Sequence, residues 1–280
     1  MAKLFPRVSR KVSKSFSYPS FGGDSSSGGG GASFDVMDVP DISAYFDAFE
    51  ASTITHVGGA VSNVASRVGT INAAQGTALL QPVYSATGRN GLPAITHNAD
   101  VLILDDVSGF PGGDDPVTII AVGYSDQSGP NYLGGYGTSG FRTAAMVIQW
   151  VVDDVVGLGF EGDTLLSSEV WTGADAIAVG IFDETLQSLF VNGGSELMAA
   201  STLNKGLTNG CIGGFIDGTA AFWLGSWQKF LIINRAITLD ERLKIEGACA
   251  HQCALTGLLR VGREKGGHLV EVALRPLRHR

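Results

Sequence analysis

The stretch that decides the fold is residues 225–247, which read GSWQKFLIINRAITLDERLKIEG. Residues 230–233 form an apolar run of aromatic and β-branched side chains that favours a strand and is too short to be a helix by itself. Thr238 and Glu241 then have the T-x-x-E spacing of a capping box, in which a hydroxyl and a carboxylate bond the backbone N–H groups at a helix start. The segment therefore predicts a core strand, a turn and a helix in that order.

Elsewhere the sequence predicts short strands and little helix. Helical periodicity is rare outside residues 239–253, and 39 glycines favour many turns. Core strands are predicted at residues 116–124 and 143–152, an antiparallel pair at 176–182 and 188–191, and further strands at 220–223 and 228–234, separated by a break at Gly225. This pattern predicts an all-β fold: a two-sheet antiparallel jelly-roll sandwich with one short C-terminal helix.

Several blocks of sequence resemble, in the right order, the laminin-G-like and concanavalin-A-like jelly-roll modules of bacteriophage virion proteins. These blocks are residues 39–48 with 52–54, residues 81–84 with 90–95, residues 189–193, and the Trp227 to Ala236 strand. Tyr45 and Phe46 stand where the family usually has Trp–Tyr. The resemblance implies a concanavalin A-like scaffold and a phage context, whereas a shared fold alone assigns no activity.

Charge divides the chain into an acidic body and two basic ends. The net charge is −8, yet residues 1–20 carry +5 and residues 260–280 carry +4, which leaves −17 for the remainder. We expect a basic aromatic anchoring arm at 1–21, a Gly/Ser linker at 22–33, the jelly-roll domain at 34–257, and a basic hairpin or arm at 258–280. The anchoring side chains combine charge with apolar surface: Lys3, Phe5, Arg7, Arg10, Lys11, Lys14, Phe16 and Tyr18.

Arm, linker, body and family resemblance together predict a non-enzymatic structural protein of a tailed-phage particle. The jelly roll would be displayed on the particle surface, as a capsid decoration or as a tail fibre or tip module, and held by its N-terminal arm. The expected partners are capsid or tail proteins of the virion and further copies of the chain, without nucleic acid, membrane or cofactor. The expected location is the virion, after synthesis in the bacterial host cytoplasm.

The alternative is a carbohydrate-binding module that recognises a receptor, such as a host surface glycan. Its candidate site is the loop at residues 124–136, where aromatic rings suited to stacking on sugars stand among polar groups suited to hydroxyls. A plain hairpin with scattered surface aromatics explains the same loop. The candidate glycan-binding residues are Tyr124, Asp126, Asn131, Tyr132 and Tyr136.

Clustered acids raise a candidate Ca²⁺ site, since Ca²⁺ takes six to eight oxygen ligands. Solvated loop acids are the competing interpretation, because the spacing matches no calcium-loop pattern. The four acids bracket a glycine-rich turn: Asp105, Asp106, Asp114 and Asp115.

A polysaccharide hydrolase and a cysteine metal site both have partial sequence support. Glu161 and Asp163 have the spacing of two of the three catalytic acids in family-16-like glucanases, but the third acid is missing. Cys249 and Cys253 flank His251 in C-x-H-x-C, yet on a helix His251 points away from the face that the two cysteines share. We therefore expect solvated turn acids in the first case, and packed cysteines with no metal in the second.

Overall fold

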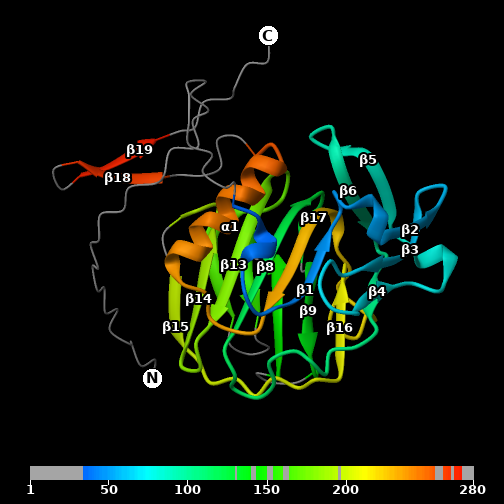
Figure 1. The fold of residues 1–280 in the computed structure, drawn as a ribbon, viewed down its shortest axis with the longest axis horizontal. Helices are drawn as coiled ribbons and strands as arrows, with labels where there is room; N and C mark the ends of the chain where they lie inside the picture. Colours follow the sequence, from blue (N-terminus) through cyan, green and yellow to red (C-terminus); the bar gives the residue numbers. More distant parts are fainter. Residues whose placement is uncertain are drawn as a thin grey trace, which may run out of the picture.

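The computed structural model describes residues 34–129, 131–139, 143–149, 154–159, 164–194, 197–255, 261–265 and 268–272. Hydrogen bonds join 17 of the described strands into one continuous network, which folds over into two layers (Figure 1). The arm at 1–21 with its eight anchoring side chains, the linker at 22–33, and the acids Glu161 and Asp163 lie outside the described residues. Their roles stay predictions.

The first layer is an antiparallel sheet in the order β1-β17-β8-β13-β14-β15. The strands predicted at 116–124, 176–182, 188–191 and 228–234 all lie in it. No strand forms at 220–223. The strand predicted at 228–234 begins earlier, at Leu224, and runs through Gly225 without the predicted break. The bounds are β1 (Ile42–Asp47), β17 (Leu224–Ile233), β8 (Val117–Ser125), β13 (Asp175–Phe182), β14 (Leu186–Val191) and β15 (Leu197–Ala200).

The second layer runs in the order β2-β3-β4-β7-β16-β9-β10-β11-β12. A hairpin of β5 (Val83–Arg89) and β6 (Leu92–Asn98) links the layers, because β6 pairs with the start of β17 and β5 pairs with β3. The bounds are β2 (Ile54–Val57), β3 (Ala60–Ala65), β4 (Asn72–Ala74), β7 (Leu102–Leu104), β16 (Asn209–Ile212), β9 (Asn131–Gly137), β10 (Ala144–Gln149), β11 (Val155–Gly159) and β12 (Leu165–Val170).

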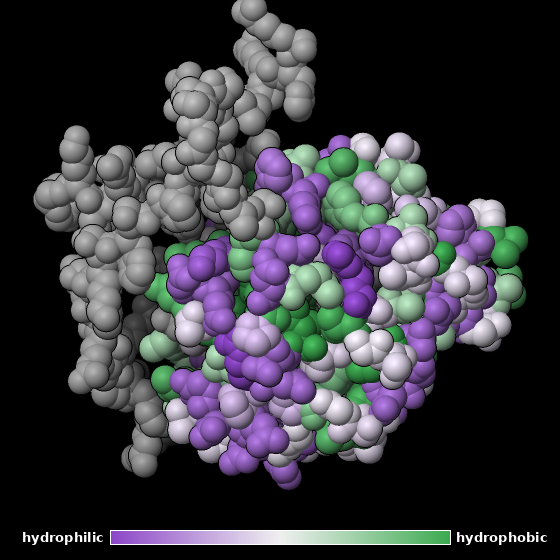
Figure 2. Space-filling model, in the orientation of Figure 1, coloured by the Kyte–Doolittle hydropathy of each residue, from purple (hydrophilic) through white to green (hydrophobic). Residues whose placement is uncertain are grey.

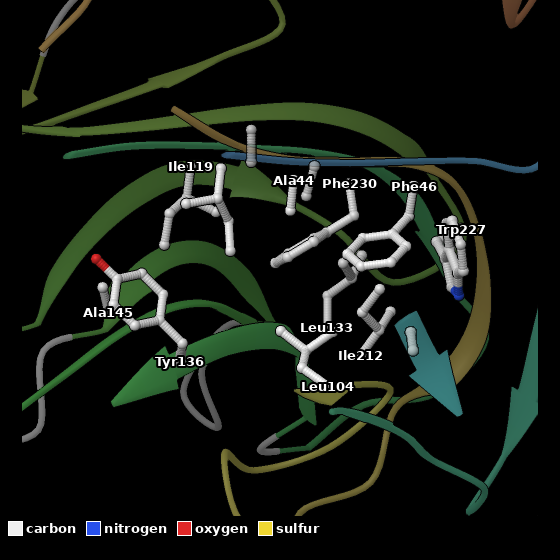
Figure 3. Close-up of a cluster of buried hydrophobic side chains, with 14 of the residues drawn as sticks. Ala44, Phe46, Leu104, Ile119, Leu133, Tyr136, Ala145, Ile212, Trp227 and Phe230 are labelled. Atoms are coloured by element: carbon white, nitrogen blue, oxygen red, sulfur yellow. The ribbon is translucent and has the colours of Figure 1, made fainter. Parts of the chain in front are cut away.

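The middle of the first sheet is buried on both faces, which explains why its central strands β17, β8 and β13 are apolar without alternation. Phe230 and Ile232 of β17 point into the core between the sheets, whereas Leu231 and Ile233 pack beneath the helix α1 (Leu239–Gln252). Figure 3 shows Phe230, Phe46 and Ile119 of the first sheet facing Leu104, Leu133 and Ile212 of the second. The two clusters on either side fix the sheet as the middle layer of the molecule.

The predicted capping box is present at the start of α1. Glu241 N donates to Thr238 Oγ1 at 3.3 Å, and Thr238 N donates to Glu241 Oε2 at 2.8 Å. Arg235 in the preceding turn adds two bonds to the Glu241 carboxylate, at 2.9 and 2.7 Å. Cys249 and Cys253 are buried beneath the helix and His251 is exposed, so His251 does not lie on the face that the two cysteines share.

The short elements complete the architecture. They are the 3-10 turns η1 (Val36–Asp38), η2 (Ala51–Thr53) and η3 (Ala78–Leu80), and the strands β18 (Val261–Lys265) and β19 (His268–Val272), which pair antiparallel as a separate two-stranded sheet. Across the described ranges, no helix is both long and apolar enough to cross a membrane. The fold is the predicted one, an all-β concanavalin A-like jelly-roll sandwich with one short helix. The division into arm, linker, domain and C-terminal segment stays a prediction.

Candidate functional site

The residues of the glycan site predicted at 124–136 do not lie together in the structure. β8 ends at Ser125 in the first sheet and β9 begins at Asn131 in the second, so the segment crosses between layers and is not a hairpin. Tyr136 lies inside the core (Figure 3), where its hydroxyl donates to the Pro111 carbonyl at 2.8 Å. A fully buried ring cannot stack on a sugar, so the assignment of Tyr136 was wrong.

The other four predicted residues do not converge either. Tyr132 packs edge-on against Phe215, with ring centroids 5.3 Å apart, in a small cluster outside the main core. Asn131 is buried, Asp126 is exposed, and Tyr124 is half-buried on the outer face of the first sheet. Tyr124 is the one of the five that belongs to an organised group of polar side chains.

A polar row crosses the outer face of the first sheet near the end of β8. Directly opposed residues of antiparallel strands project to the same face, and the partners here are Thr96, Ser226, Tyr124 and Asp175 of β6, β17, β8 and β13. Val122 and Ile177, the opposed pair on the same face nearer the middle of the sheet, pack in the apolar cluster beneath α1. The polar row therefore begins where the helix stops covering the sheet.

Arg89 reaches over this row from the tip of the β5–β6 hairpin. Its Nε and Nη2 donate to the two carboxylate oxygens of Asp175 at 2.7 and 2.9 Å, and the guanidinium carbon lies 3.4 Å from the centroid of the Tyr124 ring. Asn90 Nδ2 also donates to Asp175, at 3.3 Å. These four residues, Arg89, Asn90, Tyr124 and Asp175, are called the Arg89 cluster below.

The carboxylate of Asp175 stabilises the charged form of Arg89. Burial alone would lower the pKa of the Arg89 guanidinium, but the hydrogen bonds and the charge of Asp175 outweigh this effect and raise the pKa. The side chains of Arg89 and Asp175 keep 27% and 16% of their surface exposed. The cluster is thus a charged pair that is both held in place and open to solvent.

The local sequence explains the position of Arg89. Asn90 and Gly91 have φ of 54° and 74°, the positive values that a two-residue hairpin turn of type I′ requires at both central positions. Arg89 pairs with Leu92 across this turn. The turn signal is visible in the sequence, whereas the partner Asp175 is 86 residues away, and no local pattern connects the two.

The candidate Ca²⁺ acids Asp105, Asp106, Asp114 and Asp115 gain no support. The two oxygens of Asp105 accept bonds from the backbone and side-chain nitrogens of Asn72, at 2.9 and 2.8 Å. The buried ammonium of Lys205 lies near Asp114 and Asp115; burial lowers the pKa of Lys205 to about 8, against the opposing charge of these two acids. Among the described residues, no three acidic, histidine or cysteine side chains come together as a metal site.

Comparison with solved structures identifies sialidases as proteins of similar fold. Trypanosoma rangeli sialidase matches with a TM-score of 0.54 and 12% identity over 74% of this chain and 33% of its own. The same sialidase in complex with sialic acid matches with a TM-score of 0.52, 12% identity and the same coverage. The chain thus spans about one third of the length of these enzymes.

A carbohydrate-binding module of Ruminococcus gnavus, the CBM40 of its IT-sialidase bound to α2,3-sialyllactose, matches with a TM-score of 0.40 and 18% identity, over 47% of this chain and 82% of its own. A score this low does not indicate a shared fold. No family model and no curated protein matches the sequence.

These findings overturn two expectations. A structural protein of a tailed-phage particle was expected, but the structures above that share the fold are sialidases, and no phage or laminin-G relationship is shown. The expectation of a non-enzymatic protein is contradicted by the same finding, because the similar structures are enzymes, although a fold alone assigns no reaction to this chain. Virion partners, self-association and virion location are likewise not shown.

Proposed function

We propose that this chain is a carbohydrate-binding β-sandwich module and that the Arg89 cluster contacts the sugar. The observation that carries the proposal is the convergence of a guanidinium, a carboxylate, an amide and a tyrosine at a partly exposed point of the sheet. Such planar donors and acceptors match the hydroxyl groups of saccharides. The sandwich shared with sialidases supports the proposal at the level of the fold.

The cluster is organised before any ligand arrives. Asp175 holds two nitrogens of Arg89, and the guanidinium rests on the Tyr124 ring, so three different elements fix one another. A side chain that is already held loses little conformational entropy on binding. This arrangement favours recognition by the existing geometry, with Asn90 exposed at the turn beside it.

The charges of the described surface favour an uncharged saccharide. A sugar carboxylate is bound best by a cation that is not already neutralised. Each arginine and lysine whose side chain is described has an acidic partner or, for Lys205, is buried against the Gly113 and Asp115 carbonyls. The acidic pairs are Arg67–Asp47, Arg89–Asp175, Lys229–Asp47, Arg235–Glu241, Arg242–Glu246 and Lys244–Asp240.

A glycan array with neutral and sialylated members tests the proposal, using the wild type, Asn90→Gly and Glu184→Gly. Glycine fits the positive φ of 54° at Asn90, so this substitution removes the amide without straining the turn. Glu184 is the matched control, because it is exposed, has a φ of 80° and lies beyond the opposite end of β13. We expect neutral glycans to bind, about tenfold more weakly to Asn90→Gly, and with unchanged affinity to Glu184→Gly.

Three outcomes would count against the proposal. If no glycan binds, the chain is not a carbohydrate-binding module. If Asn90→Gly binds like the wild type, the site lies elsewhere, and if sialylated glycans are preferred, the argument for an uncharged ligand fails. The bound glycans should also be assayed for released monosaccharide, because release would make the chain a glycosidase.

A further inference from the structure

One part of this acidic chain contains no acid. Residues 51–99, which include β2 to β6 and are called the lobe below, have neither Asp nor Glu, although the whole chain has 27. The two charged side chains of the lobe, Arg67 and Arg89, are neutralised by Asp47 and Asp175 from outside it. The lobe therefore presents a surface without net charge.

The outer end of the lobe exposes aliphatic side chains. Val57 and Leu79 are 84% and 91% exposed, and Leu80 and Val83 are exposed as well. Figure 2 shows green atoms at the right-hand tip of the molecule, where Figure 1 draws β2 and β3. Val57 and Val83 lie opposite Ala60 on its two sides, so they share a sheet face. These four residues are called the apolar tip.

The lobe also ends in an unprotected strand edge. β2 pairs with β3 on one side, and no strand of the described chain pairs with its other side, since β17 pairs with β1, β6 and β8. Edge strands are commonly protected by lysine, proline or other charged residues, but the β2 sequence ITHV contains none of these. An antiparallel strand can therefore be added at this edge.

We propose that the lobe is the contact surface between two copies of this chain, which pair through the edge of β2 and the apolar tip. Outside the lobe, residues 34–50 and 100–259 carry 24 acidic against six basic side chains, a net charge of −18, so these parts of two copies repel each other. A two-fold axis brings the same patch of both copies together, as antiparallel pairing of β2 with itself requires. Arg89 and Asn90 belong to the same lobe, but neither lies in β2 or in the apolar tip, so self-association and sugar binding can be tested separately.

Other occupants fit this surface less well. A basic protein would bind the acidic remainder of the chain before an uncharged lobe. An anionic membrane attracts unpaired cations, whereas both arginines of the lobe are paired and residues 34–50 and 100–259 around it are acidic. A second copy fits better, because two lobes without net charge can meet without repelling each other.

Sedimentation velocity on the full-length chain tests the proposal with the wild type, Val57→Lys, Leu79→Lys and Val170→Lys. We expect the wild type to sediment as a dimer, with twice the chain mass of 29.2 kDa. Each lysine in the apolar tip should weaken association by at least about tenfold, because it places like charges across the two-fold axis. Val170→Lys is the control, since Val170 is 51% exposed on β12, outside the lobe, and should leave the dimer unchanged.

The effect of salt concentration on the dimer distinguishes an apolar contact from a charged one. Exposed charge pairs are screened as ionic strength rises, whereas the proposed dimer should persist or tighten in 1 M salt. A monomeric wild type would overturn the proposal. So would a double variant, Val57→Lys with Leu79→Lys, that dimerises like the wild type, or a dimer that salt dissociates.

Discussion

The indole Nε1 of Trp227 donates a 2.9 Å hydrogen bond to Nε2 of His97, and both side chains are buried. Because Nε2 accepts, the proton of the neutral imidazole is on Nδ1, which donates to the Asp100 carbonyl at 2.8 Å. Both ring nitrogens are thus bonded in one tautomer. Thr96, the neighbour of His97 in β6, projects to the opposite face and joins the polar row, so this buried bond ties β6 to β17 beneath the candidate site.

Because His97 is buried in its neutral form, we predict that the protein loses stability in acid. Burial lowers the pKa of His97 from 6.5 to about 4, so between these values the unfolded chain binds the proton and the folded chain does not. The free energy of unfolding should fall by about 3 kcal/mol as the pH drops from about 6.5 through 4, with no contribution from His97 above that range. Urea unfolding at pH 7.5 and 4.5 measures the change.

The control for this prediction is a second histidine. His97→Gln removes the titrating ring and should flatten the pH dependence, whereas His251→Gln replaces an exposed ring on α1 and should keep the wild-type slope. Equal slopes in the wild type and His97→Gln would show that other groups cause the acid sensitivity.

The buried pair of Asp47 and Lys229 should behave as a unit. Lys229 Nζ lies 2.9 Å from Asp47 Oδ1, and both side chains are almost fully buried. Asp47→Ala leaves the buried Lys229 ammonium and the Arg67 guanidinium beside it without their carboxylate and should cost about 3–5 kcal/mol. The double variant with Lys229→Met removes the buried ammonium as well and should recover part of that loss. Denaturant unfolding measures all three variants; losses that simply add would contradict the coupling.

Two glycines of residues 225–247 should respond in opposite directions to alanine. A Cβ at Gly225 would lie 2.0 Å from the Tyr124 carbonyl oxygen, a backbone atom, so Gly225→Ala should destabilise by about 1–3 kcal/mol or more. At Gly247 in α1 a Cβ meets nothing within 4 Å, and Gly247→Ala should stabilise the protein by about 0.5–1 kcal/mol. Thermal unfolding of both variants checks the signs, and shifts in the same direction would contradict the local geometry.

The sequence predicted those features that neighbouring residues determine. The capping box of Thr238 and Glu241 depends on a three-residue spacing, and strand β17 is visible as an apolar run. The break expected at Gly225 was wrong because partner strands on both sides, β6 and β8, keep the chain extended through the glycine.

The candidate site could not be predicted in the same way. Tyr124 and Tyr136 are close in sequence but belong to different sheets, and the pairing of β9 with β10 shifts register near Leu133, so the spacing of the tyrosines says nothing about which one is exposed. Arg89 and Asp175 come together only because β6, β17, β8 and β13 are neighbours in the folded sheet. Strand order is a property of the whole fold, and no short motif records it.

The position of a bound sugar tests the central claim most directly. A crystal structure of the chain with a neutral oligosaccharide selected on the array should show sugar hydroxyls within about 3.2 Å of the polar atoms of Asn90, Arg89 or Asp175, beside the Tyr124 ring. A sugar held elsewhere, for example at the exposed Asp126 loop, with the Arg89 cluster not in contact, would contradict the account.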